Sequence, residues 1–330
     1  MKLPGFWSRP SDSPGWQARA LAPLSAFATR LAAKRAAKSP TLIASIPVIC
    51  IGNINLGGSG KTPTAIEIAA RLQSRNLSVH IVSRGYGGKL AGPVRVDESF
   101  HRADDVGDEP LLLAAFAPTW VAKDRAAGVA AAQAMGAEVV LLDDGFQNPS
   151  VFKTCSIVVV DAKIGFGNGL VFPAGPLREP IEAGLERADL VLAIGNSSAQ
   201  QHFHRVWDNK LTVPLSTASL QPLETGMDWE DLDVLPFAGI GHPEKFFETL
   251  RALGANIIRA EALDDHQPLT APLMKRLELE AKALNAQLVT TEKDAVRLPK
   301  TFRQKVLTLP VRLNVPDWAA IDKVLAKAGL

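Results

Sequence analysis

The feature that most constrains this chain is a glycine-rich turn that separates an apolar run from a helix-periodic segment within residues 45–76. The run Ile46–Ile51 is almost entirely β-branched and apolar, which predicts a buried strand of a parallel sheet. After Pro63, apolar residues recur with the 3.6-residue period of a helix. A strand, a tight turn and a helix in this order favour an α/β fold with a parallel sheet flanked by helices.

The turn has the composition of a segment that holds a nucleoside triphosphate. Glycines let successive backbone N–H groups point at phosphate oxygens, and the helix N-terminus adds positive potential. Lys61 can reach the β- and γ-phosphates, and the Thr62 hydroxyl can ligate Mg²⁺. An ordinary glycine-rich turn is the alternative, and the strand-to-helix context argues against it. The predicted nucleotide-binding residues are Asn55, Leu56, Gly57, Gly58, Ser59, Gly60, Lys61 and Thr62, with Asn55 where the P-loop consensus has glycine.

A second apolar run ends in two carboxylates about eighty residues after the turn. Residues 138–142 predict a buried strand that would deliver Asp143 and Asp144 to Mg²⁺. Many strands end in Asp, so the pattern is weak alone and gains weight from the Gly-Lys-Thr turn. Glu109, at the start of a predicted helix, is a further candidate, although such carboxylates are often only caps.

Two more polar segments are candidates for the site. A long loop rich in glycine and proline, residues 166–180, contains Arg178, which can bind an anionic group or be a plain surface charge. His266 follows two aspartates and can orient or activate a neighbouring carboxylate. A histidine on a surface loop is the alternative interpretation of that segment.

Residues 1–44 differ from the rest of the chain. Seven basic residues and one acidic residue give this segment a formal charge of +6. Leu24, Phe27 and Leu31 recur at helical spacing, so the segment predicts a basic amphipathic helix. Such a helix suits the surface of an anionic bilayer, but it can equally pack on the chain's own core with a solvated basic face.

The chain as a whole bounds the remaining possibilities. Its 330 residues suggest two domains, which we place at 45–205 and 206–330. A net charge of +2 argues against a nucleic-acid partner, and nothing in the sequence indicates an obligate protein partner. Both cysteines, Cys50 and Cys155, lie in apolar runs and are expected to be buried free thiols. No run of eighteen apolar residues occurs.

Taken together, these motifs resemble those of the tetraacyldisaccharide 4'-kinase family. The matching stretches run in order along most of the chain, and that family also usually lacks glycine at the position of Asn55. Two positions depart from the family pattern: Asn148 and Gln267 stand where histidine is common. The matching residues are Gly52-Asn53, Gly57–Pro63, Ser83–Gly87, Gly107–Pro110, Lys123–Arg125, Asp143–Gln147, Phe166–Gly169, Pro173–Pro180, Phe237–Phe247, Asp265-His266 and Thr291–Leu298.

The resemblance implies an ATP-dependent kinase that phosphorylates the 4'-hydroxyl of a tetraacylated glucosamine disaccharide 1-phosphate. It implies Asp108 as the general base, His266 as its partner, and Lys61 as a catalytic residue. Arg125, with Gln147 and Arg178, would bind substrate. A substrate with four acyl chains stays in a bilayer, so the resemblance places the protein at the cytoplasmic face of the inner membrane of a Gram-negative bacterium and favours the membrane role of the N-terminal helix.

Two other classes of function remain open at this point. One is a soluble P-loop ATPase or GTPase of metal insertion or transport, which would need a metal-ligand cluster or a base-reading motif that the sequence lacks. The other is a non-catalytic nucleotide sensor at the membrane, in which Asp108 and His266 would be dispensable.

Overall fold

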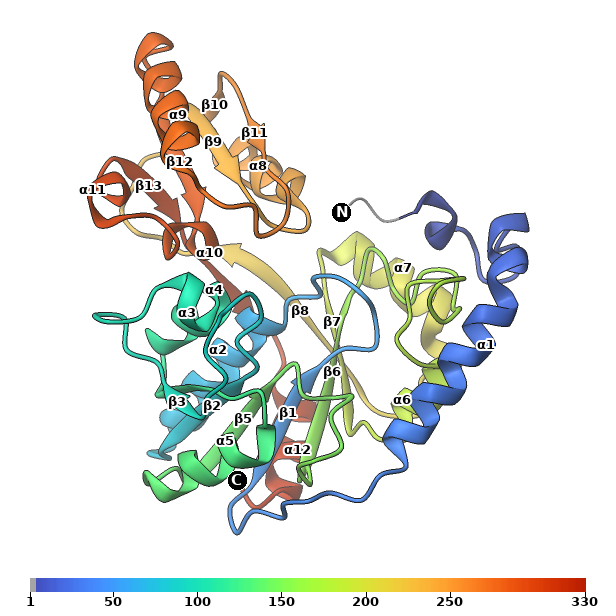
Figure 1. The fold of residues 1–330 in the computed structure, drawn as a ribbon. Helices are drawn as coiled ribbons and strands as arrows, with labels where there is room; N and C mark the ends of the chain where they lie inside the picture. The colour runs from blue at the N-terminus through green and yellow to red at the C-terminus, as the bar shows by residue number, and fades with distance from the viewer. Residues whose placement is uncertain (1–3) are drawn as a thin grey trace.

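The computed structural model describes residues 4–330, so the first three residues of the basic N-terminal region lie outside the described residues. The chain forms two lobes, each built on its own sheet (Figure 1). The larger lobe holds a nine-stranded sheet in the order β14-β8-β7-β6-β1-β5-β2-β4-β3. Its strands are β1 (Val48–Gly52), β2 (Val79–Ser83), β3 (Val94–Arg95), β4 (Thr119–Val121), β5 (Val139–Asp143), β6 (Cys155–Asp161), β7 (Leu190–Ile194), β8 (Leu215–Pro222) and β14 (Val311–Asn314).

Neighbouring strands of this sheet run parallel except at its two edges, where β14 and β3 are antiparallel to β8 and β4. The central strands are buried along their whole length, because helices cover both faces. Side chains alternate between the faces, so Ile49 and Ile51 of β1 join one core while Val48 and Cys50 join the other. The sequence prediction of a parallel sheet flanked by helices is therefore confirmed.

Two sets of helices make the two cores. The core that contains Ile49 is closed by α2 (Lys61–Gln73), α4 (Asp108–Ala114) and α12 (Ala319–Lys327). The core that contains Cys50 is closed by α5 (Arg125–Ala134), α6 (Ile181–Leu185) and α7 (Ser197–Trp207). Short elements complete the lobe: α3 (Ala103–Val106) and the 3₁₀ turns η1 (Gly5–Ser8) and η2 (Asp208–Lys210). Cys50 and Cys155 are both buried and free, as expected.

The smaller lobe is a second parallel α/β unit. Its sheet has the order β10-β9-β12-β13, with β11 also paired to β9. Its two faces carry separate apolar clusters, one around Phe246 and one around Leu277. The elements are β9 (Asp233–Ala238), α8 (Pro243–Ala252), β10 (Asn256–Ile257), β11 (Glu261–Ala262), α9 (Ala271–Ala283), β12 (Gln287–Thr291), α10 (Glu292–Ala295), α11 (Lys300–Arg303) and β13 (Val306–Leu309).

The division between the lobes differs from the expected boundary at residues 205 and 206. Strand β8 belongs to the large sheet, and β14 returns to pair with it after the small lobe is complete. Only Pro310 separates β13 of one sheet from β14 of the other. The small lobe is thus an insertion, residues 233–309, between two neighbouring strands of the large sheet. Long-range pairing of this kind leaves no local signal in the sequence.

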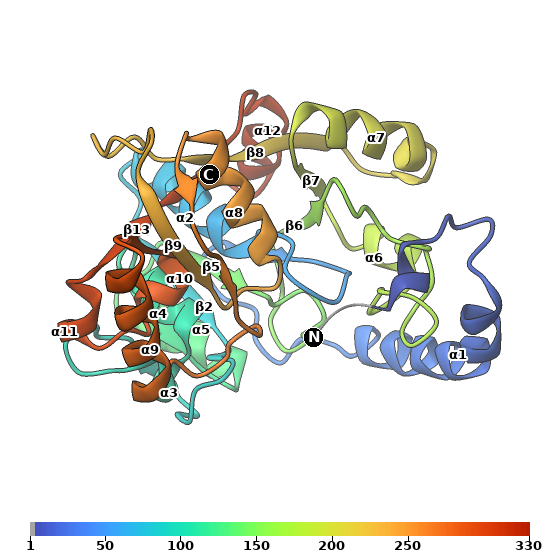
Figure 2. The same cartoon turned by 90° about the horizontal axis from the view of Figure 1, so that it is seen from above.

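The basic N-terminal segment forms α1 (Trp16–Ala36), which lies along one side of the large lobe (Figure 2). Leu24, Phe27 and Leu31 are each more than half exposed, whereas Ala18 and Ser25 are buried against the lobe. Among residues 4–330, no helix combines the length and the apolar character needed to cross a bilayer. The amphipathic helix is therefore confirmed, and its apolar side chains point partly away from the protein.

Three hydrogen bonds attach this N-terminal region to the glycine- and proline-rich loop, one of them from Asn168 Nδ2 to the carbonyl oxygen of Phe6 at 3.4 Å. Ser25 Oγ donates to the carbonyl oxygen of Val171 at 2.7 Å, and Trp7 Nε1 donates to that of Pro173 at 3.1 Å. The same loop continues to Arg178, so the helix and a candidate site residue are fixed to one segment.

Candidate active site

The glycine-rich turn lies where β1 ends and α2 begins, between two strands that pair with β1 on either side. Gly57 and Gly60 have φ of 108° and 92°, a region that side chains with a Cβ disfavour. Ser59 is buried, and its hydroxyl oxygen has no hydrogen-bond partner among the described residues. A buried unpaired hydroxyl in a turn that opens a helix is what a phosphate group would satisfy.

The first two residues of the predicted nucleotide segment have other partners. Asn55 Nδ2 donates to the carbonyl oxygen of Gly165 at 3.0 Å. The backbone N–H of Leu56 donates to that of Pro176 at 2.7 Å. Asn55 and Leu56 therefore hold the loop of residues 163–180 against the turn, and the Leu56 amide is already engaged.

Asp143 lies at the end of β5, next to the turn, and is buried. Its Oδ2 accepts a hydrogen bond of 3.0 Å from Ser83 Oγ, while its Oδ1 is buried and has no hydrogen-bond partner in residues 4–330. Burial, together with the negative charges of Glu109 and Asp144, raises the pKa of Asp143 to about 7. A carboxylate that is costly to ionise and has a free oxygen fits a site for a divalent cation.

Asp144 follows with φ of 51°, in the left-handed region that non-glycine residues seldom occupy outside strained or functional sites. Its carboxylate lies 3.7 Å from Lys61 Nζ and 3.1 Å from a terminal nitrogen of Arg178. Burial would raise the pKa of Asp144, but these two cations outweigh it and the pKa falls below its usual value. The three side chains form one charged cluster beside the turn.

A polar network around Arg178 extends this cluster. The guanidinium also donates to Gln147 Oε1 at 3.0 Å. Gln147 Nε2 in turn donates to Glu179 Oε1 at 3.0 Å, and Arg187 pairs with the other oxygen of Glu179. The sequence analysis named Arg178 and Gln147 but missed Glu179 and Arg187. Glu179 is buried, and its only sequence signal is its place directly after Arg178.

Arg125 is placed differently from the expected substrate clamp. It is only 3% exposed. Its guanidinium donates to the carbonyl oxygen of Ala122 at 2.8 Å and lies 3.5 Å from that of Asp143. Burial lowers its pKa despite the nearby aspartates. Arg125 therefore stabilises the backbone at the end of β5 and is not exposed for contact with a substrate.

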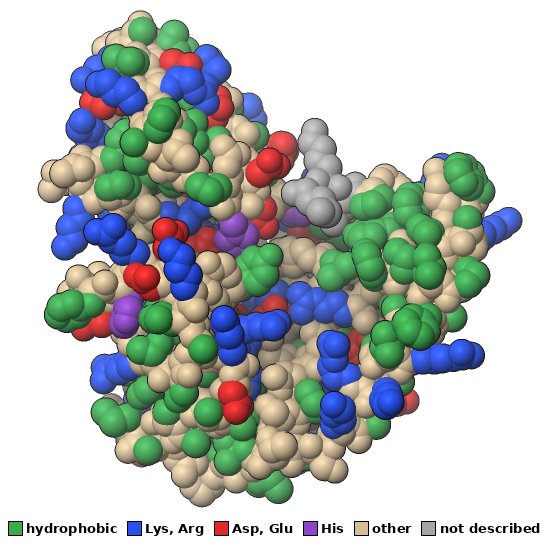
Figure 3. Space-filling model, viewed as in Figure 1, with side chains coloured by type: hydrophobic (Ala, Val, Ile, Leu, Met, Phe, Trp, Pro, Cys, Tyr) green, Lys and Arg blue, Asp and Glu red, His purple; other side chains and the backbone are tan. Residues whose placement is uncertain are grey.

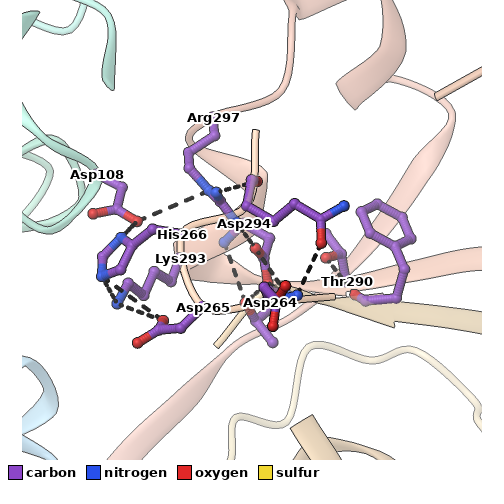
Figure 4. Close-up of polar contacts among 12 residues, drawn as sticks. Asp108, Asp264, Asp265, His266, Thr290, Lys293, Asp294 and Arg297 are labelled. Carbon is purple, nitrogen blue, oxygen red and sulfur yellow. Dashed lines mark hydrogen bonds and ion pairs between the residues drawn. The ribbon is translucent and has the colours of Figure 1, made fainter. Parts of the chain in front are cut away.

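The second part of the site lies at the junction of the two lobes. Figure 3 shows histidine and acidic side chains in the hollow between the lobes, with lysines and arginines beside them. Asp108, the first residue of α4, comes from the large lobe, and His266, in the loop after β11, comes from the small lobe. His266 Nδ1 lies 2.9 Å from Asp108 Oδ2 (Figure 4). The two residues that the family resemblance pairs are thus in contact.

Several features fix Asp108 in this position. The other carboxylate oxygen accepts a hydrogen bond of 2.9 Å from the backbone N–H of Glu109. Burial would raise the pKa of Asp108, but the His266 hydrogen bond and the charges of Lys293 and Arg297 lower it below the usual value. Asp108 is therefore a buried carboxylate that remains ionised.

His266 is held in a strained backbone conformation. Its φ is 58°, which few histidines adopt and which costs on the order of 1 kcal/mol or more. The ring is tilted against that of Tyr86, from the Arg-Gly-Tyr-Gly loop, with 5.6 Å between the centroids. The tertiary structure therefore aims the imidazole at Asp108 against the local preference of the backbone.

Sequence reasoning missed two cations at this junction. Lys293 of α10 lies 3.2 Å from Glu109 Oε1, and Arg297 Nε lies 3.9 Å from Asp108 Oδ2. Lys293 belongs to the Thr-Glu-Lys-Asp segment of residues 291–294, whose polar clustering was the available signal, and Arg297 follows that segment three residues later. Glu109, predicted as a metal ligand, points to the small lobe with one of its oxygens.

Comparisons with known proteins agree along the chain. The model of a family described as tetraacyldisaccharide-1-P 4'-kinase matches residues 17–329. Proteins named tetraacyldisaccharide 4'-kinase from Dinoroseobacter shibae and Jannaschia sp. are 57% and 56% identical to this chain. These alignments cover 98% and 99% of this chain, and 97% and 100% of the two relatives.

A solved structure has the same fold. A crystal structure of LpxK from Aquifex aeolicus in complex with ATP matches with a TM-score of 0.74 and 24% sequence identity. The match covers 95% of this chain and 99% of that chain. Both lobes are therefore part of the shared architecture.

Proposed function

The chain belongs to the tetraacyldisaccharide-1-P 4'-kinase family, and from this membership we propose how its residues carry out the reaction. The enzyme transfers the γ-phosphoryl group of ATP to the 4'-hydroxyl of a tetraacylated glucosamine disaccharide 1-phosphate, a step of lipid A biosynthesis. The observation that carries the mechanism is the 2.9 Å contact between Asp108 and His266 across the two lobes.

The residues from Gly57 to Thr62 hold the triphosphate. Backbone N–H groups of the turn and the positive end of α2 face the phosphate oxygens, and Lys61 neutralises charge on the β- and γ-phosphates. The unpaired hydroxyl of Ser59 supports this assignment. The ATP named with the Aquifex aeolicus structure supports adenine nucleotide as the donor. We exclude Leu56 from the phosphate-binding residues, because its backbone N–H already donates to the carbonyl oxygen of Pro176.

Thr62, Asp143 and Asp144 are the proposed Mg²⁺ ligands, directly or through water. The free oxygen of Asp143, and the cost of ionising this carboxylate without a cation, support the assignment. When bound, Mg²⁺ would neutralise charge that develops on the transferred phosphoryl group. We assign Glu109 to its contact with Lys293 in place of a direct metal bond.

Asp108 is the proposed general base. It is ionised and buried, and the His266 hydrogen bond fixes its orientation. As the 4'-oxygen bonds to the γ-phosphorus and the bond to the leaving ADP oxygen breaks, the hydroxyl proton passes to the Asp108 carboxylate. The pair forms only when the two lobes are in contact. In an open form, water that reaches the triphosphate would therefore lack a positioned base to activate it.

Arg178 and Gln147 are the proposed contacts for the polar part of the substrate. Without ligands their side chains bond to each other and to Asp144, so they are already positioned beside the triphosphate turn. Arg125 is reassigned to the support of Asp143, because it is buried and bonds to backbone oxygens.

The decisive experiment incubates the purified protein with ATP, Mg²⁺ and the acylated disaccharide 1-phosphate. Mass spectrometry is expected to show a bisphosphorylated product, and omission of the lipid should leave ATP almost unconsumed. ATP or GTP hydrolysis at an equal rate without the lipid, and no lipid product, would instead support the soluble ATPase or GTPase of metal insertion or transport. No feature of the site favours that alternative, and the relatives argue against it.

We also propose that α1 places the protein on the cytoplasmic surface of the inner membrane. The helix exposes an apolar row that includes Phe27 beside basic side chains, which suits an anionic bilayer. Phe27→Glu should lower sedimentation with anionic vesicles about tenfold, because it removes an exposed aromatic ring that would insert into the bilayer and adds a charge that the bilayer repels. Phe100→Glu, at a more exposed position outside the helix, is the matched control. Equal binding of both variants would contradict a membrane role for α1.

A further inference from the structure

Lys293, in the small lobe, contacts residues of both lobes where the lobes meet. Its Nζ lies 3.3 Å from His266 Nε2 and 3.2 Å from Glu109 Oε1, with Asp265 Oδ1 at 3.9 Å (Figure 4). The side chain is 21% exposed. The mechanism above gives this lysine only its ion pair with Glu109, although it also contacts the histidine that orients the proposed base.

The hydrogen-bonding capacities of the neighbours decide how His266 is protonated. An ionised Asp108 can only accept hydrogen bonds, and an ammonium group can only donate them. The imidazole lies between them, with Nδ1 toward the carboxylate and Nε2 toward the ammonium at 3.3 Å, which is nearer than Asp265 Oδ1 at 3.7 Å and within hydrogen-bond distance. Both contacts are satisfied only when Nδ1 carries the proton and Nε2 is the acceptor, which is the neutral Nδ1–H tautomer.

We propose that Lys293 is a positioning residue that holds His266 in the Nδ1–H tautomer and thereby keeps Asp108 oriented for proton acceptance. The proposal rests on the proposed function, because it assigns a role to Lys293 within that reaction. In the opposite tautomer, the Nδ1 lone pair would face an Asp108 oxygen, and the hydrogen bond that orients the carboxylate would be lost.

A shared set of hydrogen bonds fixes the positions of Lys293 and His266 within the small lobe. Asp294 is fully buried, and its carboxylate accepts hydrogen bonds from the Gly239 N–H and from Thr291 Oγ1. The carbonyl oxygen of Gly239 accepts a bond of 3.2 Å from the His266 N–H. One residue at the end of β9 therefore sets the position of both α10 and the His266 loop, so the 3.3 Å contact does not depend on lobe closure.

The surrounding charges keep the lysine protonated. Burial acts to lower the pKa of Lys293, but Glu109, Asp108 and Asp265 outweigh it and the pKa rises. The Asp108 hydrogen bond raises the pKa of His266 above its usual value, against the opposing effects of burial and of the Lys293 charge. An imidazolium would direct an N–H at an ammonium 3.3 Å away, so Lys293 disfavours that form.

The test compares Lys293→Met with Lys293→Arg and with Lys245→Met. Methionine keeps much of the length and removes the charge, whereas arginine is still a donor-only cation. Lys245 of α8 is the matched control, because it also joins the lobes, through Asp161 at 2.5 Å, without touching His266. NMR of ¹⁵N-histidine-labelled protein measures the protonation of the two ring nitrogens of His266, and the signals missing in His266→Gln identify them. The kcat and the KM for ATP are measured in parallel.

Wild-type protein is expected to show a protonated Nδ1 and an unprotonated Nε2. Lys293→Met should change that pattern and lower kcat by about 10- to 100-fold, with KM for ATP within about twofold. Lys293→Arg should keep the wild-type pattern and recover most of the lost kcat. Lys245→Met should keep the pattern and lower kcat by at most about fivefold, because the Lys245 side chain is half exposed and does not contact His266.

A wild-type Nε2 that carries a proton, whether or not Nδ1 is also protonated, would overturn the proposal. So would an unchanged His266 pattern in Lys293→Met, even with reduced kcat, because the lysine would then act only by docking the lobes. The nitrogen spectra need no lipid and therefore remain decisive if the disaccharide proves not to be the substrate. If Lys293→Met does not fold, the wild-type and arginine spectra decide the question in the same way.

Discussion

The two halves of the active site are built in different ways. The phosphate-binding half comes from neighbouring strands of one sheet, where Ile51 of β1 pairs with Asp143 of β5 just before the turn. The acid–base half joins Asp108 and His266, which are 158 positions apart and belong to different lobes. The first half is held together by a buried sheet, whereas the second exists only where the lobes meet.

The two halves are therefore expected to have separate functions, nucleotide binding in the first and proton transfer in the second. A triphosphate can bind to the large lobe whether or not the small lobe is in place, because every residue from Gly57 to Thr62 belongs to the large lobe. Proton transfer needs His266, and so it needs closure. Mutations in the first half should therefore affect nucleotide affinity and rate together, and mutations in the second should affect rate alone.

The largest effect is expected for Lys61→Ala in the first half. Loss of this cation should lower kcat/KM by about three orders of magnitude or more and weaken ATP binding, because the ammonium faces the phosphates before and during transfer. Steady-state kinetics and ATP titration measure the two effects. Lys163→Ala, at an exposed position of the neighbouring loop, should stay near wild type. Normal ATP affinity in Lys61→Ala would break the proposed division between the halves.

Asp108→Asn is the matching change in the second half. The amide keeps the shape of the side chain but cannot accept the hydroxyl proton, so kcat should fall by about 10²- to 10⁴-fold. ATP affinity should stay within about twofold of wild type, which calorimetry can measure. A near-normal kcat would remove Asp108 from the role of base, and lost ATP affinity would show that the two halves are not separable.

Asp143→Asn should give a smaller effect, on stability without Mg²⁺ and nucleotide. The pKa of Asp143 is raised to about 7 in the fold, well above its value in an unfolded chain. The folded protein thus binds more protons between about pH 4 and pH 7, so the wild type loses stability as pH rises through that range.

Asparagine has no such titration, so the variant should gain Tm relative to wild type at pH 8 and lose most of that gain at pH 5. Thermal unfolding in EDTA at both pH values measures this. Added Mg²⁺ with ATP should reverse the advantage, because the cation would hold Asp143 ionised. A Tm difference that is the same at both pH values would show that Asp143 ionises normally in the fold.

Much of the first half was predictable from the sequence. The apolar run before Gly52, the turn up to Thr62 and the Asp143-Asp144 pair are local patterns, and parallel strands bring their carboxyl ends to one edge. What the sequence left out here are contacts with distant backbone. The engagement of Leu56 with Pro176 and the burial of Arg125 depend on how loops pack, and no spacing along the chain records that.

Little of the acid–base half was predictable from the spacing of residues along the sequence. The family resemblance pairs Asp108 with His266, but nothing in the spacing of the chain shows that they meet. The role of Lys293 and the tie between Glu109 and the small lobe become visible only once α10 is placed against α4. The insertion of residues 233–309 between β8 and β14 is likewise a matter of strand pairing over a long sequence distance.

By itself, the sequence determined the elements and the chemistry that each can supply: a phosphate turn, a pair of carboxylates at a strand end, and a basic amphipathic helix. These follow from interactions between residues a few positions apart, such as hydrophobic periodicity and the φ that glycine allows. The tertiary structure alone decided which groups face each other across the lobes. That outcome depends on burial and charge pairing between segments far apart in the chain, which fix the protonation of Asp143 and the orientation of His266 only after the whole molecule has folded.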